Sequence, residues 1–77
     1  MRRLLVTPQF ERDLKQLPTE IITASDDVVS VLRENPLDNT LNIQKLQGFD
    51  PPLWRVRIRH YRLVYSFSDD SLTLHRF

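Results

Sequence analysis

The clearest hydrophobic pattern in the chain lies in residues 53–67, where apolar side chains occupy nearly every second position. Alternation with a period of two predicts β-strands, and the change of phase at Arg59-His60 predicts two strands joined by a two-residue turn. In this register Arg57 lies directly opposite Arg62, on the face that is not buried. The other face carries only apolar and aromatic residues: Trp54, Val56, Ile58, Tyr61, Leu63 and Tyr65.

The chain before this hairpin begins with a short strand and a helix. Residues 2–6 form an apolar run with a basic start, which predicts an edge strand. Thr7-Pro8 has the residue types of an N-cap followed by the first helical position. Apolar residues at positions 10, 14 and 17 recur at helical spacing, so we expect a helix of about three turns that ends at Pro18.

Residues 19–34 are compatible with either a strand or a helix. Their many β-branched residues suit a strand. However, the apolar or small residues at positions 22, 25, 29 and 32 have helical spacing, and Asn35-Pro36 is a typical helix stop. Sixteen residues also exceed the length of an ordinary strand. We therefore predict a second helix, antiparallel to the first.

The remaining segments predict a long connection and a last strand. Residues 35–52 are rich in Asn, Pro and Asp, with Leu41, Ile43 and Leu46 expected to fasten them to the sheet. A polar turn at 68–71 leads into a strand over 72–77, which would place His75 opposite Val64 on the arginine face. The predicted order is βααβββ in one domain, 1–77. It is an α+β fold whose two antiparallel N-terminal helices pack on one face of a small antiparallel sheet.

Composition limits the function classes. The chain has no cysteine, which excludes disulfides and thiolate metal sites and fits a cytoplasmic protein. It contains no apolar run of membrane-spanning length. Asp69-Asp70 has no third ligand nearby and is interpreted as a turn, so we expect neither a metal nor another cofactor.

Charge is distributed unevenly along the chain. The overall net charge is +1, but residues 1–52 contain six basic and eight acidic groups, whereas residues 53–77 contain five basic and two acidic groups. Like charges at opposed positions destabilise a sheet, so Arg57 and Arg62 either extend into water or hold an anion. Arginine suits phosphate because it stays charged and donates through a rigid fork. The competing interpretation is an ordinary solvated sheet exterior.

The chain resembles the RelE/ParE superfamily of bacterial toxins from toxin–antitoxin pairs over almost its whole length. The most specific part is the basic strand Trp54-Arg55-Val56-Arg57-Ile58 followed by Tyr61-Arg62-Leu63-Val64-Tyr65. Supporting matches are Phe10 with Asp13-Leu14-Lys15 and Leu17, Asn35-Pro36, and Lys45-Leu46 with Gly48. The resemblance implies a small α+β toxin that a cognate antitoxin neutralises. RelE-type members cut mRNA in the ribosomal A site without a metal, and ParE-type members poison DNA gyrase.

The resemblance also implies roles for individual residues. Arg62 takes the position of the arginine that stabilises the phosphate, and Arg55 and Arg57 take the positions of the basic pair that holds the RNA backbone. Arg59 in the turn completes the expected phosphate-binding set. His75 is the candidate for proton transfer, because imidazole titrates near neutral pH. Its competing interpretation is an ordinary surface residue.

One departure from the family leaves three functions open. Family members usually continue with a Gly-His-Arg-like segment and a tyrosine, and this sequence ends at Leu74-His75-Arg76-Phe77, where that segment would begin. The first function is ribosome-dependent mRNA cleavage, with the ribosome, mRNA and an antitoxin as partners. The second is gyrase inhibition. The third is an inactive or truncated relative that only binds its antitoxin.

Overall fold

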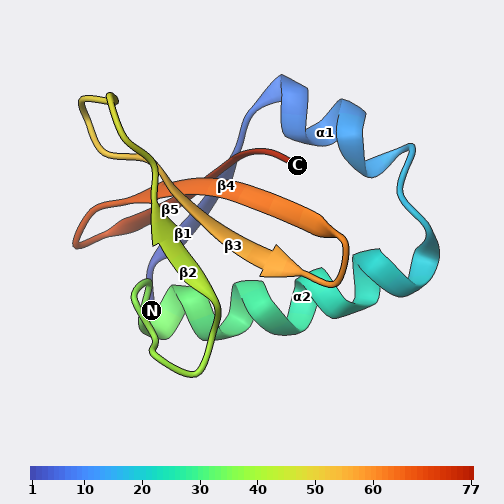
Figure 1. Cartoon of the computed structure of the whole chain (residues 1–77), viewed down its shortest axis with the longest axis horizontal. Coiled ribbons are helices and arrows are strands. Elements are labelled where there is room, and N and C mark those ends of the chain that lie inside the picture. Colours follow the sequence, from blue (N-terminus) through green and yellow to red (C-terminus); the bar gives the residue numbers. More distant parts are fainter.

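Two helices and five strands make up the chain, and the computed structural model describes all residues 1–77. In chain order they are β1 (Arg3–Val6), α1 (Pro8–Leu14), α2 (Thr19–Glu34), β2 (Ile43–Lys45), β3 (Trp54–Ile58), β4 (Tyr61–Phe67) and β5 (Ser71–Arg76). The strands form one sheet in the order β1-β5-β4-β3-β2, in which only β1 and β5 are parallel (Figure 1). The α+β class predicted from the sequence is confirmed.

The central hairpin has the predicted register. Trp54 pairs with Tyr65, Val56 with Leu63, Arg57 with Arg62 and Ile58 with Tyr61. The turn between β3 and β4 consists of residues 59 and 60, and Arg59 takes a φ of 56° there. This left-handed conformation is disfavoured for a residue with a Cβ atom, so the turn is strained at one position.

The two helices follow from local sequence signals. The N–H of Phe10 donates to Thr7 Oγ1 (3.1 Å), which caps α1, and Pro8 occupies the first turn. This helix has seven residues and is shorter than expected. The N–H groups of Gln16 and Leu17 donate three residues back, so the chain tightens into a turn before Pro18. The second helix spans all sixteen residues that the spacing predicted.

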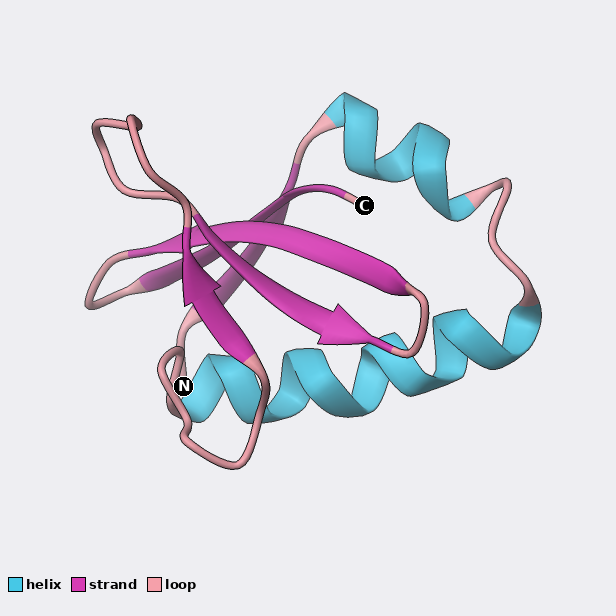
Figure 2. Ribbon diagram, in the orientation of Figure 1, coloured by secondary structure: helices cyan, strands magenta, loops and turns pink.

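The hydrophobic core lies between α2 and one face of the sheet. Leu32 of α2 is fully buried in the same cluster as Val56, Leu63 and the other inward-facing strand residues. Figures 1 and 2 show α2 running along the sheet. The preceding helix, α1, runs in the opposite direction beside the end of β5. The hydroxyl of Tyr65 donates to the carbonyl of Pro36 (2.6 Å), which fixes the chain after α2 to the core. Neither helix is long and apolar enough to cross a bilayer.

Three further details differ from the expectation. Residues 43–45, predicted to be part of a connection, form a fifth strand because they pair with β3. The sheet is mixed rather than purely antiparallel, since β1 runs parallel to β5. The predicted pairing of His75 with Val64 is wrong. A β-bulge shifts the register between Val64 and Tyr65, so Val64 pairs with Arg76 and the extra residue lies at position 75.

Candidate nucleic-acid interface

The sheet face opposite α2 carries the arginines of the central hairpin. Arg55 and Arg57 alternate with core residues on β3, and Arg62 does the same on β4, so the pleat directs all three away from the core. They line a small cleft of about 70 Å³ together with Asn42 and Gln44. We call this surface the arginine face.

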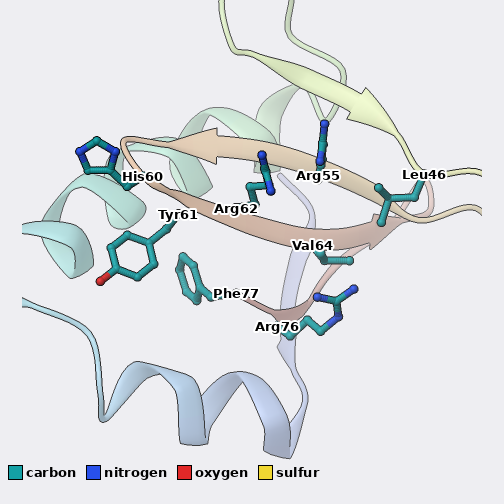
Figure 3. A pocket seen from close by; sticks show the side chains of 8 residues that line it. All are labelled: Leu46, Arg55, His60, Tyr61, Arg62, Val64, Arg76 and Phe77. Carbon is teal, nitrogen blue, oxygen red and sulfur yellow. The ribbon is translucent and has the colours of Figure 1, made fainter.

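A larger cavity of about 460 Å³ adjoins this cleft. Arg55 and Arg62 line both, and Arg76 joins them from β5, so three guanidinium groups border the larger space (Figure 3). Val64 forms part of the lining and is 3% exposed. The complete lining is Leu46, Arg55, His60, Tyr61, Arg62, Val64, Arg76 and Phe77. We call it the arginine cavity.

The arginine face is not neutralised from within the chain. The only ion pair joins Arg59 to Glu20 at 3.7 Å, and both side chains are exposed. No carboxylate pairs with Arg55, Arg57 or Arg62. Arg55 instead donates to the amide oxygen of Gln44 on β2, a neutral partner that leaves its charge uncompensated. The concentration of positive charge therefore favours an external anion.

His75 occupies a different part of the open face from Arg62. Its Nε2 lies 2.8 Å from the hydroxyl oxygen of Ser66, which is four residues beyond Arg62 on the same strand, or about 13 Å along it. His75 does not line the arginine cavity. Partial burial, with a smaller effect from the positive charge of Arg76, lowers the pKa of His75, so its imidazole is neutral near pH 7.

The structure brings together some of the predicted site residues and adds others. Arg55, Arg57 and Arg62 lie close together, whereas Arg59 points from the turn to Glu20 and lines neither the cleft nor the cavity. His60 and Arg76 line the cavity and were not predicted as site residues. The sequence feature that could have identified Arg76 is its position as a basic residue at the end of the strand that follows the β3–β4 hairpin.

The fold is that of known toxins. It matches the RelE–RelB complex of Pyrococcus horikoshii OT3 with a TM-score of 0.82 and 23% identity, covering 97% of this chain and 90% of the other. The DinJ–YafQ toxin–antitoxin complex of E. coli matches with a TM-score of 0.80 and 19% identity, covering 97% and 88%. A copper-bound L66S mutant toxin from Helicobacter pylori matches with a TM-score of 0.73 and 23% identity, covering 99% of this chain and 91% of the other.

The sequence itself places the chain in a family. No curated protein sequence matches it. Residues 4–75 match the family described as the ParE toxin of the type II toxin–antitoxin system parDE. This match spans both helices, the β3–β4 hairpin and nearly all of the last strand. The chain therefore belongs to the ParE toxin family of type II toxin–antitoxin systems, within the RelE/ParE superfamily.

Proposed function

We propose that this toxin inhibits translation in the cytoplasm by cutting mRNA on the ribosome without a metal. The observation that carries the proposal is the unneutralised arginine face, where Arg57 and Arg62 are paired across two strands. A sheet that only needed a soluble exterior would gain stability from opposite charges at these positions. A phosphate backbone supplies the missing negative charge.

In the proposed mechanism the 2′-hydroxyl of the RNA loses its proton and its oxygen attacks the adjacent phosphorus. The bond from phosphorus to the 5′-oxygen of the next nucleotide then breaks and that oxygen takes up a proton, which leaves a 2′,3′-cyclic phosphate and a 5′-hydroxyl. Before this bond breaks, negative charge accumulates on the non-bridging oxygens of the phosphorane. Arg62 stabilises this charge from the arginine cavity, since a guanidinium group donates charge-assisted hydrogen bonds to phosphate oxygens. Arg55 and Arg57 hold the neighbouring phosphates.

Proton transfer in this mechanism falls to an imidazole. His60 lines the arginine cavity, and His75 lies further along the same face with a lowered pKa. Histidine titrates near neutral pH and suits general acid–base work. Replacing each histidine with alanine separates the two, because only the histidine that transfers the proton changes the pH profile of cleavage.

The test is an assay with translating ribosomes, purified toxin and a defined mRNA. We expect A-site cuts with the wild-type chain, no cuts without ribosomes, and a loss of about 100-fold or more in rate for Arg62→Ala. Arg12→Ala is the matched control, because it removes the same charge from an exposed position on α1. Undiminished cutting by Arg62→Ala would contradict the assignment.

Gyrase inhibition is the second candidate function, and the match to the ParE family favours it. A gyrase poison needs the same scaffold but no chemistry on RNA. With this function, mRNA stays intact on translating ribosomes, and DNA is cleaved or left relaxed when gyrase is present. Running both assays on one preparation therefore separates the two functions.

An antitoxin is the proposed partner under either function. The relatives from P. horikoshii and E. coli were crystallised with RelB and DinJ. An antitoxin that covers the arginine face with acidic residues would also block RNA. We therefore propose that a cognate antitoxin and RNA compete for this toxin.

A further inference from the structure

The short helix α1 holds the last residues of the chain from both of its ends. At its start, the hydroxyl of Thr7 donates to the carbonyl of His75 (2.6 Å). At its last turn, Asp13 Oδ2 accepts the N–H of Phe77 (2.9 Å). These two groups belong to the peptide units on either side of Arg76. The backbone that carries Arg76 is therefore fixed on both sides by side chains of α1 and its cap.

Aromatic packing fixes the same segment between those two hydrogen bonds. The ring of Phe77 stacks on Phe10 of α1, with ring centroids 5.4 Å apart. It also meets the ring of Tyr61 edge-on at 6.5 Å. Contacts of this kind stabilise the segment beyond the effect of the area that they bury. Figure 3 shows Phe77 beside Tyr61, with the Arg76 side chain directed to the opposite side, near Val64.

Asp13 is itself oriented by α1. Its second carboxylate oxygen, Oδ1, accepts from the side-chain amide of Gln9 one turn earlier (2.8 Å). Its two oxygens thus have separate partners, Gln9 within the helix and the Phe77 N–H outside it. Asp13 has no cationic partner in the chain.

We propose that α1 is the positioning element for Arg76, with Thr7 and Asp13 fixing the two peptide units that flank it so that its guanidinium group stays in the arginine cavity. The proposal rests on the proposed function in that the bound anion is RNA phosphate. In this arrangement Asp13 is a positioning residue that acts through Arg76. It supports phosphate binding although its own charge opposes an anionic ligand.

Because the charge of Asp13 opposes an anionic ligand, the proposal predicts a change in affinity opposite to the change expected from charge alone. Removing a carboxylate from a nucleic-acid-binding protein ordinarily strengthens binding, because it removes repulsion. Asp13→Ala is expected to weaken binding about threefold instead, since a loosened Arg76 loses its phosphate contact. Asp13→Asn keeps an oxygen acceptor for the Phe77 N–H, so it restores wild-type affinity or exceeds it. Glu11→Ala is the matched control, because Glu11 is an exposed acid on the same helix whose side chain has no ion pair in the chain.

The binding probe is a short single-stranded oligonucleotide with 2′-O-methyl riboses, which the toxin cannot cleave. We expect the slope of log affinity against log salt to fall by about 0.7 in Asp13→Ala, which corresponds to one phosphate contact. Arg76→Ala should show the same loss, and adding Asp13→Ala to it should weaken binding no further. Equal losses in Asp13→Ala and Asp13→Asn, or additive losses in the double variant, would overturn the proposal.

NMR measures the positioning without any RNA. In Asp13→Ala the Phe77 amide should exchange with solvent about fivefold faster, as expected for a lost hydrogen bond, and the contacts between the Phe77 and Tyr61 rings should weaken. Asp13→Asn should retain both. Unchanged exchange and ring contacts in Asp13→Ala would overturn the inference. If these signals change as expected but the wild-type chain binds no RNA, then α1 positions Arg76 and the proposed function fails.

Discussion

Arg57 and Arg62 face each other on adjacent strands, where like charges are unfavourable. Both side chains are exposed, and neither has a carboxylate partner in the chain. The repulsion is therefore present in the free protein and falls when an anion binds between the two residues. The same two charges therefore lower the stability of the free protein and favour the binding of an anion.

We predict that Arg57→Gln stabilises the free toxin and weakens RNA binding. The free energy of unfolding should rise by about 0.5 kcal/mol at low salt because the repulsion is removed. The gain should vanish in molar salt, where the screening length is only about 3 Å. Urea unfolding at the two salt concentrations measures the effect. Arg12→Gln on α1 is the control, and the prediction fails if both variants gain the same stability.

Tyr65 provides a prediction for alkaline pH. It is fully buried, and burial raises the pKa of its hydroxyl above the ordinary value near 10. The folded state therefore keeps the phenol proton when the unfolded state loses it, so stability falls as pH rises through and above 10. We expect Tyr65→Phe to lose about 1 to 2 kcal/mol at neutral pH, because the buried Pro36 carbonyl loses its donor.

The same variant should also lose part of the pH dependence. Between neutral pH and pH 11, the free energy of unfolding of Tyr65→Phe should fall less than that of the wild-type chain. Urea titrations across this range provide the comparison, and Tyr61→Phe on the same strand is the control because Tyr61 is only half-buried. Identical pH profiles for the wild-type chain and Tyr65→Phe would contradict the assignment of the raised pKa.

At the scale of the elements, the β3–β4 turn sets the predicted strand register although one of its two residues has an unfavourable backbone conformation. Arg59 adopts a φ of 56°, and its ion pair with Glu20 is exposed, so that pair offsets little of the strain. Arg59→Gly should raise the free energy of unfolding by about 1 kcal/mol. His60→Gly, at the neighbouring position without positive φ, should lower it by about 0.5 to 1 kcal/mol. Thermal unfolding of the two variants tests the turn, and a loss of stability in Arg59→Gly would contradict this account.

The sequence predicted the hairpin well because its signal is local. Strict alternation fixes which side chains share a face, and the break at residues 59 and 60 fixes the register. The position of Arg55, Arg57 and Arg62 on one open face followed directly. The partner of β1 did not, since its parallel pairing with β5 joins segments almost seventy residues apart.

Other features depended on contacts that no local pattern records. Residues 43–45 are too few to show alternation and form a strand only because β3 lies alongside them. The bulge at His75 moved Arg76 into register with Val64, which is why the arginine cavity contains Arg76 and not His75. Likewise, nothing in the sequence indicated that Asp13 on α1 accepts a backbone hydrogen bond from Phe77.

At the scale of the whole molecule, charged side chains are unevenly distributed over the surface. The arginine face lies on one side of the sheet, whereas α2 covers the other side and exposes acidic residues. These are Glu20, Asp26, Asp27 and Glu34. A net charge of only +1 therefore conceals an uneven distribution of charge, which under the proposed function would favour the approach of RNA to the arginine face.

The whole molecule also leaves an apolar sheet edge uncovered, which leads to a prediction about association. Leu4, Leu5 and Val6 of β1 are 38%, 39% and 40% exposed. The N–H groups of Arg3 and Thr7 bond towards β5, so the N–H and C=O groups of Leu4 and Val6 point outwards. An exposed edge strand with a mainly apolar sequence tends to pair with another strand, and Arg3 is the only charged residue of β1. We expect the isolated toxin to associate as its concentration rises, and Leu5→Lys to suppress the association by placing a charge on the edge. Sedimentation across a concentration series measures this, with Leu37→Lys, an exposed apolar position outside the strands, as the control. A wild-type chain that stays monomeric at high concentration, or equal association of wild-type and Leu5→Lys, would show that β1 does not recruit a partner strand.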